Sequence, residues 1–204
     1  MARIDDYASA KDLAVEKLKQ ENFETLLKRS GFDAAGPNVF RVPFLGKAYR
    51  ISYPEFDFAQ DSEAPGEIPL QEQVLLLHYL LAPMVPRKET WITYREIPDA
   101  SFYFPAFVKR AADPLKKVFG EDARPFARAA KALSGVPIDA GDEAAQFQVL
   151  PRIGIQIILW EGDDEFPPEA NILFAENIGE LLSPEDIAML SGMLAYRLMG
   201  AAEV

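Results

Sequence analysis

An acidic segment at residues 158–170, ILWEGDDEFPPEA, carries the residues whose types and spacing could do chemistry. If this segment is extended, Glu161, Asp163 and Glu165 alternate along the chain and face the same way. Clustered carboxylate oxygens are the ligands that Mg²⁺ and Ca²⁺ prefer. The segment as a whole offers candidate ligand- or partner-binding residues: Trp160, Glu161, Asp163, Asp164 and Glu165.

No cation-binding or nucleotide-binding motif accompanies these carboxylates. Counted from Glu161, the sixth position is Phe166, where an EF-hand requires glycine. The Gly46-Lys47 pair is followed by Ala48 and lacks the upstream glycine of a phosphate-binding loop. We therefore favour no metal at this segment and keep Glu161, Asp163 and Glu165 as weak metal-ligand candidates. The plainer interpretation is a solvated transition from strand to loop, which a partner could also contact.

Three further candidates lie outside the acidic segment. His78 is the only histidine, so a site with two imidazoles is excluded. On a nearly all-apolar helix it is expected to be a hydrogen-bonded core residue; the alternative is that it opens into a pocket beside Tyr79. Arg95 lies in an aromatic-rich stretch at residues 91–107, where core packing and a ligand-pocket rim are both possible. No G-x-S-x-G nucleophile elbow is present.

Composition and charge exclude several classes of protein. The 204 residues include no cysteine, which removes disulfides, thiolate catalysis and iron–sulfur ligation by this chain. The net charge of −11 arises in residues 139–204, which hold thirteen carboxylates and two basic residues. A nucleic-acid partner would require a broad basic face, and we predict none. The longest apolar run, residues 74–85, is too short to span a membrane, so we expect a cytoplasmic protein without membrane contact.

The order of the expected elements indicates the fold class. We expect a helix over about residues 5–30 that ends near Gly31, a β-hairpin over residues 39–53, and a buried central helix over residues 69–82. Later elements are a short strand in residues 89–98, helices over 104–119 and 121–134, strands within 145–162 and 169–174, and a helix that follows the N-cap Ser183. Residues 54–66 are expected to form an ordered loop or a short strand.

This order lacks a steady alternation of strand and helix, so it predicts an α+β fold. We expect an antiparallel or mixed sheet packed against the central buried helix, with additional helices around it. Residues 1–34 are predicted to form an N-terminal helix that packs on or extends the domain. Residues 35–204 are predicted to form a single α+β domain.

Four stretches resemble a known family: EQVLLLHYLLA, TWITYREIP, FQVLPRIGIQIILWEGDDEFPPEANILF and LLSPEDIAML. They are similar to the uncharacterised prokaryotic family called domain of unknown function 3786, over about residues 35–200. The family has no assigned activity and so implies no catalytic residues. Relatives that join this domain to cysteine-rich iron–sulfur segments imply a link to anaerobic one-carbon or corrinoid metabolism. This chain has no cysteine, so any such cluster would belong to a partner.

These observations lead to three functional hypotheses. The first is a non-catalytic binding or accessory protein, whose unidentified protein or small-molecule partner contacts the 161–169 loop and the aromatic stretch. The second is a divalent-metal-dependent hydrolase or transferase that uses the carboxylates of residues 161–165 to activate a water. The third is a structural homodimer through the C-terminal helix, which requires an exposed stripe at Ile187, Leu190 and Leu194. No cofactor is predicted.

Overall fold

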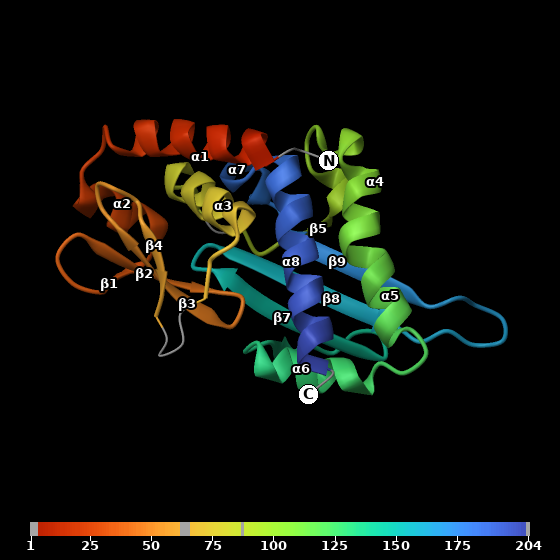
Figure 1. Ribbon diagram of the computed structural model, residues 1–204. Coiled ribbons are helices and arrows are strands. Elements are labelled where there is room, and N and C mark those ends of the chain that lie inside the picture. The colour runs from red at the N-terminus through yellow and green to blue at the C-terminus, as the bar shows by residue number, and fades with distance from the viewer. Residues whose placement is uncertain (1–3, 62–65, 87, 203–204) are drawn as a thin grey trace. The chain divides into compact units, whose positions relative to one another are not determined.

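The computed structural model describes residues 4–61, 66–86 and 88–202, and the chain divides into two units at residues 85 and 86 (Figure 1). Each unit contains helices and one antiparallel sheet, which confirms the predicted α+β class. We expected one sheet and a boundary at residue 34. Instead, the N-terminal helices share a unit with the first hairpin. None of the helices in the described ranges has an apolar stretch long enough to cross a bilayer.

Two helices, α1 (Ile4–Leu18) and α2 (Phe23–Ser30), open the first unit. The prediction of one continuous helix over this region was wrong, because Asn22 begins a new helix. Its side chain accepts a hydrogen bond from the Thr25 N–H at 2.9 Å, which is the usual N-cap interaction. The predicted end of the helix is confirmed: Gly31 adopts the left-handed conformation at φ 73° and caps α2.

The first sheet follows the predicted hairpin of β2 (Val39–Phe44) and β3 (Lys47–Ser52). The strand order is β1-β2-β3-β4, in which β1 (Asp33–Ala34) and β4 (Phe58–Gln60) form the edges. Strand β1 pairs with β2 only at Phe40 and Arg41. Pro43 lies beyond this pairing, so its missing N–H removes no hydrogen bond between the two strands. Within the predicted loop at residues 54–66, residues 62–65 lie outside the described residues.

Helix α3 (Leu70–Leu81) is the buried helix that the sequence predicted. Val74–Leu77 and Leu80 are buried in the first unit, and two of the polar contacts that fix the helix come from tyrosine hydroxyls. The Tyr79 hydroxyl donates to the Ser30 carbonyl at 2.7 Å, and the Tyr49 hydroxyl of β3 donates to the Glu72 carboxylate at 2.5 Å. The Tyr79 ring also packs against Phe32.

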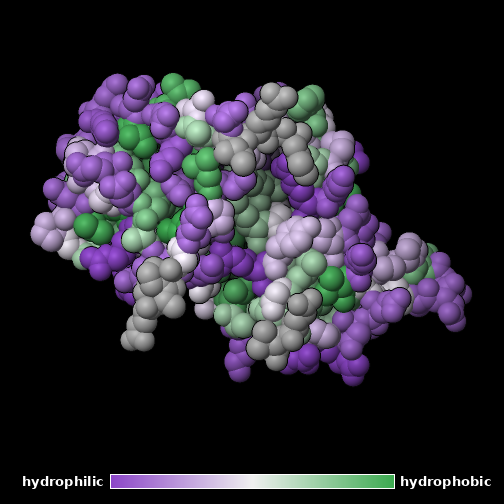
Figure 2. Space-filling model, viewed as in Figure 1, coloured by the Kyte–Doolittle hydropathy of each residue, from purple (hydrophilic) through white to green (hydrophobic). Residues whose placement is uncertain are grey.

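The second unit is built on a five-stranded antiparallel sheet of order β5-β9-β8-β7-β6. Its strands are β5 (Trp91–Thr93), β6 (Val136–Pro137), β7 (Glu143–Leu150), β8 (Ile153–Trp160) and β9 (Glu169–Ala175). The predicted strands at residues 145–162 and 169–174 are confirmed. The long β8–β9 connection projects beyond the sheet (Figure 1), and its surface is mostly hydrophilic (Figure 2).

The helices of the second unit gather against this sheet (Figure 1). After the 3₁₀ turns η1 (Tyr94–Glu96) and η2 (Ala100–Phe102), one continuous helix runs through α4 (Phe104–Phe107), the π-helical turn η3 (Val108–Ala112) and α5 (Asp113–Phe119). The remaining helices are α6 (Arg124–Ala132), α7 (Ile178–Leu181) and α8 (Pro184–Ala202).

The C-terminal helix α8 begins as the sequence predicted. The Ser183 hydroxyl accepts from the Asp186 N–H at 3.2 Å and lies 2.7 Å from the Asp186 carboxylate, to which it donates. The stripe at Ile187, Leu190 and Leu194 is fully buried, and α8 packs against α4, η3, α5 and α6. The exposed stripe that a dimer through this helix requires is therefore not formed.

Candidate functional site

A cavity of about 450 Å³ lies in the second unit between β9 and the α4–η3–α5 helix. We call it the β9 groove. Its lining comes from four segments: Thr93–Arg95, the helix residues Phe104, Phe107, Val108, Ala112 and Lys116, the loop residues Pro167 and Pro168, and Glu169–Ile172 of β9. The volume is within the range of small-ligand and peptide sites. The groove thus joins the aromatic stretch to the end of the acidic loop.

The helical wall of the groove is a stripe of residues spaced four apart. They are Phe104, Val108, Ala112 and Lys116. In a regular α-helix, positions four apart drift by about 40° around the axis, because one turn takes 3.6 residues. The wider π-helical turn at Val108–Ala112 offsets this drift and keeps the stripe on one face. The local helix geometry therefore builds the wall.

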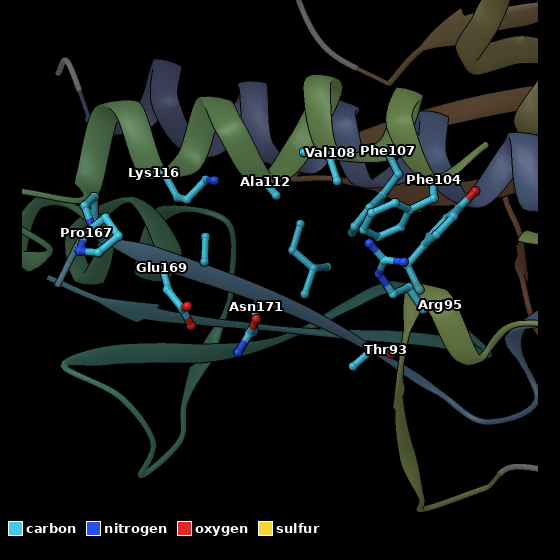
Figure 3. A pocket seen from close by; sticks show the side chains of 14 residues that line it. Thr93, Arg95, Phe104, Phe107, Val108, Ala112, Lys116, Pro167, Glu169 and Asn171 are labelled. Carbon is cyan, nitrogen blue, oxygen red and sulfur yellow. The ribbon is translucent and has the colours of Figure 1, made fainter. Parts of the chain in front are cut away.

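The strand wall is supplied by β9. Ala170, Ile172 and Phe174 alternate with Asn171 and Leu173, and the Phe174 ring contacts Phe107 of the helix at 6.1 Å between centroids. Ala170 and Ile172 consequently form the apolar side that faces the helix. Asn171 is exposed, and its side chain lies on the other side of the strand, away from the helix (Figure 3).

Two cationic side chains lie at opposite ends of the groove (Figure 3). At one end, the Arg95 guanidinium lies over the Phe104 ring, 3.7 Å from its centroid, in a cation–π contact. At the other end, the Lys116 amine lies 2.9 Å from the Asp113 carboxylate on the same helix. Among the described residues, Arg95 has no carboxylate within ion-pair distance. The groove therefore presents an oriented guanidinium that can accept an anionic ligand group.

Tyr94 holds the aromatic end of the groove together. Its ring stacks on Phe107 with 4.3 Å between centroids, and its hydroxyl donates to the Pro184 carbonyl at 2.6 Å. Burial raises the pKa of Tyr94 to about 12, and the neighbouring Tyr103 adds to this shift. The phenol is thus a neutral structural group at ordinary pH.

Glu161 of the acidic segment anchors the loop to the corner between α5 and α6. Its carboxylate accepts from the Ala123 N–H at 2.7 Å, just before α6 begins, where a helix N-terminus favours negative charge. The Gly162 N–H donates to the Gly120 carbonyl at 2.8 Å, and the Glu161 N–H donates to the Asp142 carboxylate at 2.7 Å. Glu161 therefore positions the loop that closes one end of the groove.

Asp163 shapes the tip of the same loop. One carboxylate oxygen accepts from the Glu165 N–H at 2.8 Å and from the Phe166 N–H at 2.7 Å. The Phe166 contact, followed by the Glu165 contact, lowers the pKa of Asp163 below its ordinary value. Asp164 and Glu165 are exposed, and Trp160 is 37% exposed.

The structure does not bring these carboxylates to one point. Glu161 turns toward α6, whereas Asp163 turns back into its own loop. Within the described ranges, no group of three or more His, Asp or Glu side chains is placed to hold a metal ion.

The candidates His78 and Tyr79 belong to α3 in the first unit and do not line the β9 groove. His78 is half-buried, and Tyr79 is fully buried with its hydroxyl bound to Ser30. Of the candidates from the sequence, Arg95 is the one that contributes to the groove.

The aromatic-rich stretch at residues 91–107 included Phe104 and Phe107 of the groove. Sequence reasoning did not single out Val108, Ala112 and Lys116 on the helix, or Ala170–Ile172 on β9. One signal was available: Asn171 is a polar residue within the otherwise apolar run ANILF. A second cavity, of about 310 Å³, lies between α6 and the β6–β7 edge and is mainly apolar.

Comparison with known protein families identifies the family of this chain. The family described as "Domain of unknown function (DUF3786)" matches residues 22–197. The chain belongs to this family. The DUF3786 match begins at α2, earlier than the resemblance at residues 35–200 suggested, and it includes the whole β9 groove. Neither a curated protein nor a solved structure gives a significant match to the chain.

Proposed function

We propose that this DUF3786 protein is a non-catalytic binding protein whose ligand occupies the β9 groove. One observation supports this above all: Arg95 is held over Phe104 at the mouth of a cavity and has no acidic partner among the described residues. A guanidinium oriented in this way recognises carboxylates and phosphates through paired hydrogen bonds. The apolar middle of the groove would bind the uncharged part of the same ligand.

The chemistry of the lining favours binding over catalysis. Arg95 and Lys116 are cations, and Tyr94 stays protonated to about pH 12. Catalysis by proton transfer needs a group that titrates near the working pH, which a buried phenol of this kind does not provide. The arrangement is suited to holding an anionic, partly apolar ligand.

The two alternative functions gain less support from the described residues. A metal-dependent hydrolase would need the carboxylates of residues 161–165 to converge, and Glu161 and Asp163 are each engaged by backbone N–H groups. A dimer through α8 would need the stripe that is buried in the second unit. The link to anaerobic one-carbon or corrinoid metabolism stays a prediction from family resemblance.

A fragment screen by ligand-observed NMR tests the proposal. The library would contain carboxylates, phosphates and neutral aromatic compounds of similar size. We expect carboxylate or phosphate fragments with an apolar group to bind the wild type. They should lose binding to Val108→Trp, because this half-buried residue lines the groove and the larger side chain would fill it.

Lys109→Trp is the matched control, because Lys109 is exposed and does not line the groove. Fragments should bind this variant as they bind the wild type. If no fragment distinguishes Val108→Trp from Lys109→Trp, the β9 groove is not the binding site.

A further inference from the structure

Strand β9 has an open edge inside the groove. On one side it pairs with β8 from Glu169 to Phe174. On the other side, β5 pairs only with residues 173–175, and the chain then turns away into η1. Among the described residues, Glu169–Ile172 therefore has a strand neighbour on the β8 side only.

The pairing pattern shows where the backbone groups of this edge point. The Glu176 N–H donates to the Thr90 carbonyl at 2.9 Å, so these two residues form a hydrogen-bonded pair beside β5. Backbone groups alternate in direction along an antiparallel strand. Phe174, Ile172 and Ala170 consequently turn their N–H and C=O groups away from β8. The N–H and C=O groups of Ala170 lie beyond the end of β5 and face the groove.

The groove has the dimensions of a short extended segment. Four residues of open edge correspond to about 13 Å, at roughly 3.3 Å per residue. In a strand added beside this edge, alternate side chains would face the helix stripe at Val108 and Ala112, and the others would lie on the side of Asn171. Backbone hydrogen bonds supply affinity in this mode of recognition, and side-chain pockets supply specificity.

The charges of the groove indicate what such a segment should carry. Arg95 and Lys116 lie at opposite ends (Figure 3), and the cavity between them is lined by Phe107, Val108 and Ile172. Glu169 lies on the same side of β9 as Asn171 and points away from the helix (Figure 3), so it disfavours a carboxylate on that side of the added strand. Arg95 and Lys116 lie on the helix side, because Arg95 stacks on Phe104 and Lys116 belongs to the helix stripe. The complementary segment therefore has an apolar residue in its centre and a carboxylate two residues away on each side, all facing the helix.

We infer that the β9 groove binds an extended segment of a partner protein, which adds to the sheet as an antiparallel strand in line with β5. The inference rests on the proposed function, because both use the same groove, and it names the class of ligand. The segment would pair with the backbone of Ala170, place a central apolar side chain against Val108 and Ala112, and direct a carboxylate side chain near each end, on the same face, to Arg95 and Lys116.

Synthetic pentapeptides test the inference on the 204-residue protein. The probe is the acetylated and amidated peptide ETVTE, titrated to millimolar concentration against isotope-labelled protein and followed by NMR. We expect saturable shifts at Ala170 and Ile172. N-methylation of the valine should weaken binding about tenfold or more, because its N–H would face β9 and pair with Ala170. N-methylation of the first threonine, whose N–H would point away, should have little effect.

Charge reversal gives a second readout that does not depend on backbone chemistry. Lys116→Glu should bind ETVTE about tenfold more weakly and should gain affinity for the peptide KTVTK. Lys117→Glu is the matched control, because Lys117 is exposed and does not line the groove. It should behave as the wild type toward both peptides.

The outcomes separate this inference from the proposed function. Fragment binding that Val108→Trp abolishes, together with no binding of ETVTE, would show a small-molecule site and overturn the inference alone. Equal binding of the two N-methylated peptides would also reject strand addition. A concentration-dependent dimer that Val108→Trp disrupts would assign the edge to a second copy of this chain instead of a partner. The absence of both fragment and peptide binding would reject both proposals.

Discussion

At the scale of single residues, the side chains that promised chemistry in the sequence serve mainly to build the site. Glu161 binds the Ala123 N–H before α6, and Asp163 binds two N–H groups of its own loop. Spacing alone could not distinguish these roles from metal ligation, because the partners are backbone groups contributed by the fold. Arg95 was found from its aromatic surroundings, since Phe104 lies close in sequence and orients it.

Tyr94 yields a prediction of pH dependence. Its pKa rises from an ordinary value of 10 in the unfolded chain to about 12 in the fold, so the folded state holds the phenolic proton more tightly. The corresponding stabilisation is complete below pH 10 and is lost as the pH rises from 10 to about 12. Tyr94→Phe should therefore lose less stability than the wild type over this window, as measured by urea denaturation at a series of pH values.

At neutral pH the same variant should be less stable than the wild type by about 1 kcal/mol, because the Pro184 carbonyl loses its donor. Parallel pH dependence of the two proteins above pH 10 would show that Tyr94 does not carry the effect.

At the scale of elements, local signals determined what the sequence could predict. The β2–β3 hairpin and the Ser183 cap of α8 were predicted because residues close in the chain specify them. The break before α2 was missed, because an asparagine inside a charged helical pattern is ambiguous until its contact with Thr25 is seen. The β9 groove was missed for another reason. The register that leaves Ala170 unpaired on one side depends on where β5 ends, which is a tertiary property.

The corner between α5 and α6 gives the prediction at this scale. A Cβ atom built on Gly120 would lie 2.6 Å from Pro168 Cβ and would also meet the Lys116 carbonyl, so the loop could not keep its position. We expect Gly120→Ala to destabilise the protein by roughly 1–3 kcal/mol, as overpacking does. It should also weaken any ligand of the groove, because Pro168 lines it. Thermal denaturation and the NMR screen would measure these effects.

Gly200→Ala provides the contrast. Gly200 lies in α8, and a Cβ atom there meets nothing within 4 Å. Replacing glycine by alanine within a helix should stabilise it by roughly 0.5–1 kcal/mol. If both variants changed stability in the same direction, the close approach at Gly120 would not be the cause.

At the scale of the whole molecule, the net charge is distributed unevenly along the sequence. The net charge of −11 comes from residues 139–204, yet the β9 groove places Arg95 and Lys116 beside that acidic region. Because the Debye length is about 8 Å at physiological ionic strength, a bound ligand responds to these nearby cations more than to the net charge. Acidic composition therefore does not exclude an anionic ligand.

The two units have separate aromatic cores, which leads to the last prediction. Phe40 packs against Phe23 and Phe32 in the first unit, and Phe126 packs against Phe119 and Phe147 in the second. Replacing a buried phenylalanine by alanine costs roughly 3–5 kcal/mol. We expect Phe40→Ala to reduce hydrogen-exchange protection in residues 1–85 while α8 and β7–β9 keep theirs, and Phe126→Ala to do the reverse. If either variant lowered protection equally in both ranges, the chain would unfold as one cooperative unit, and the groove could not be studied independently of the first 85 residues.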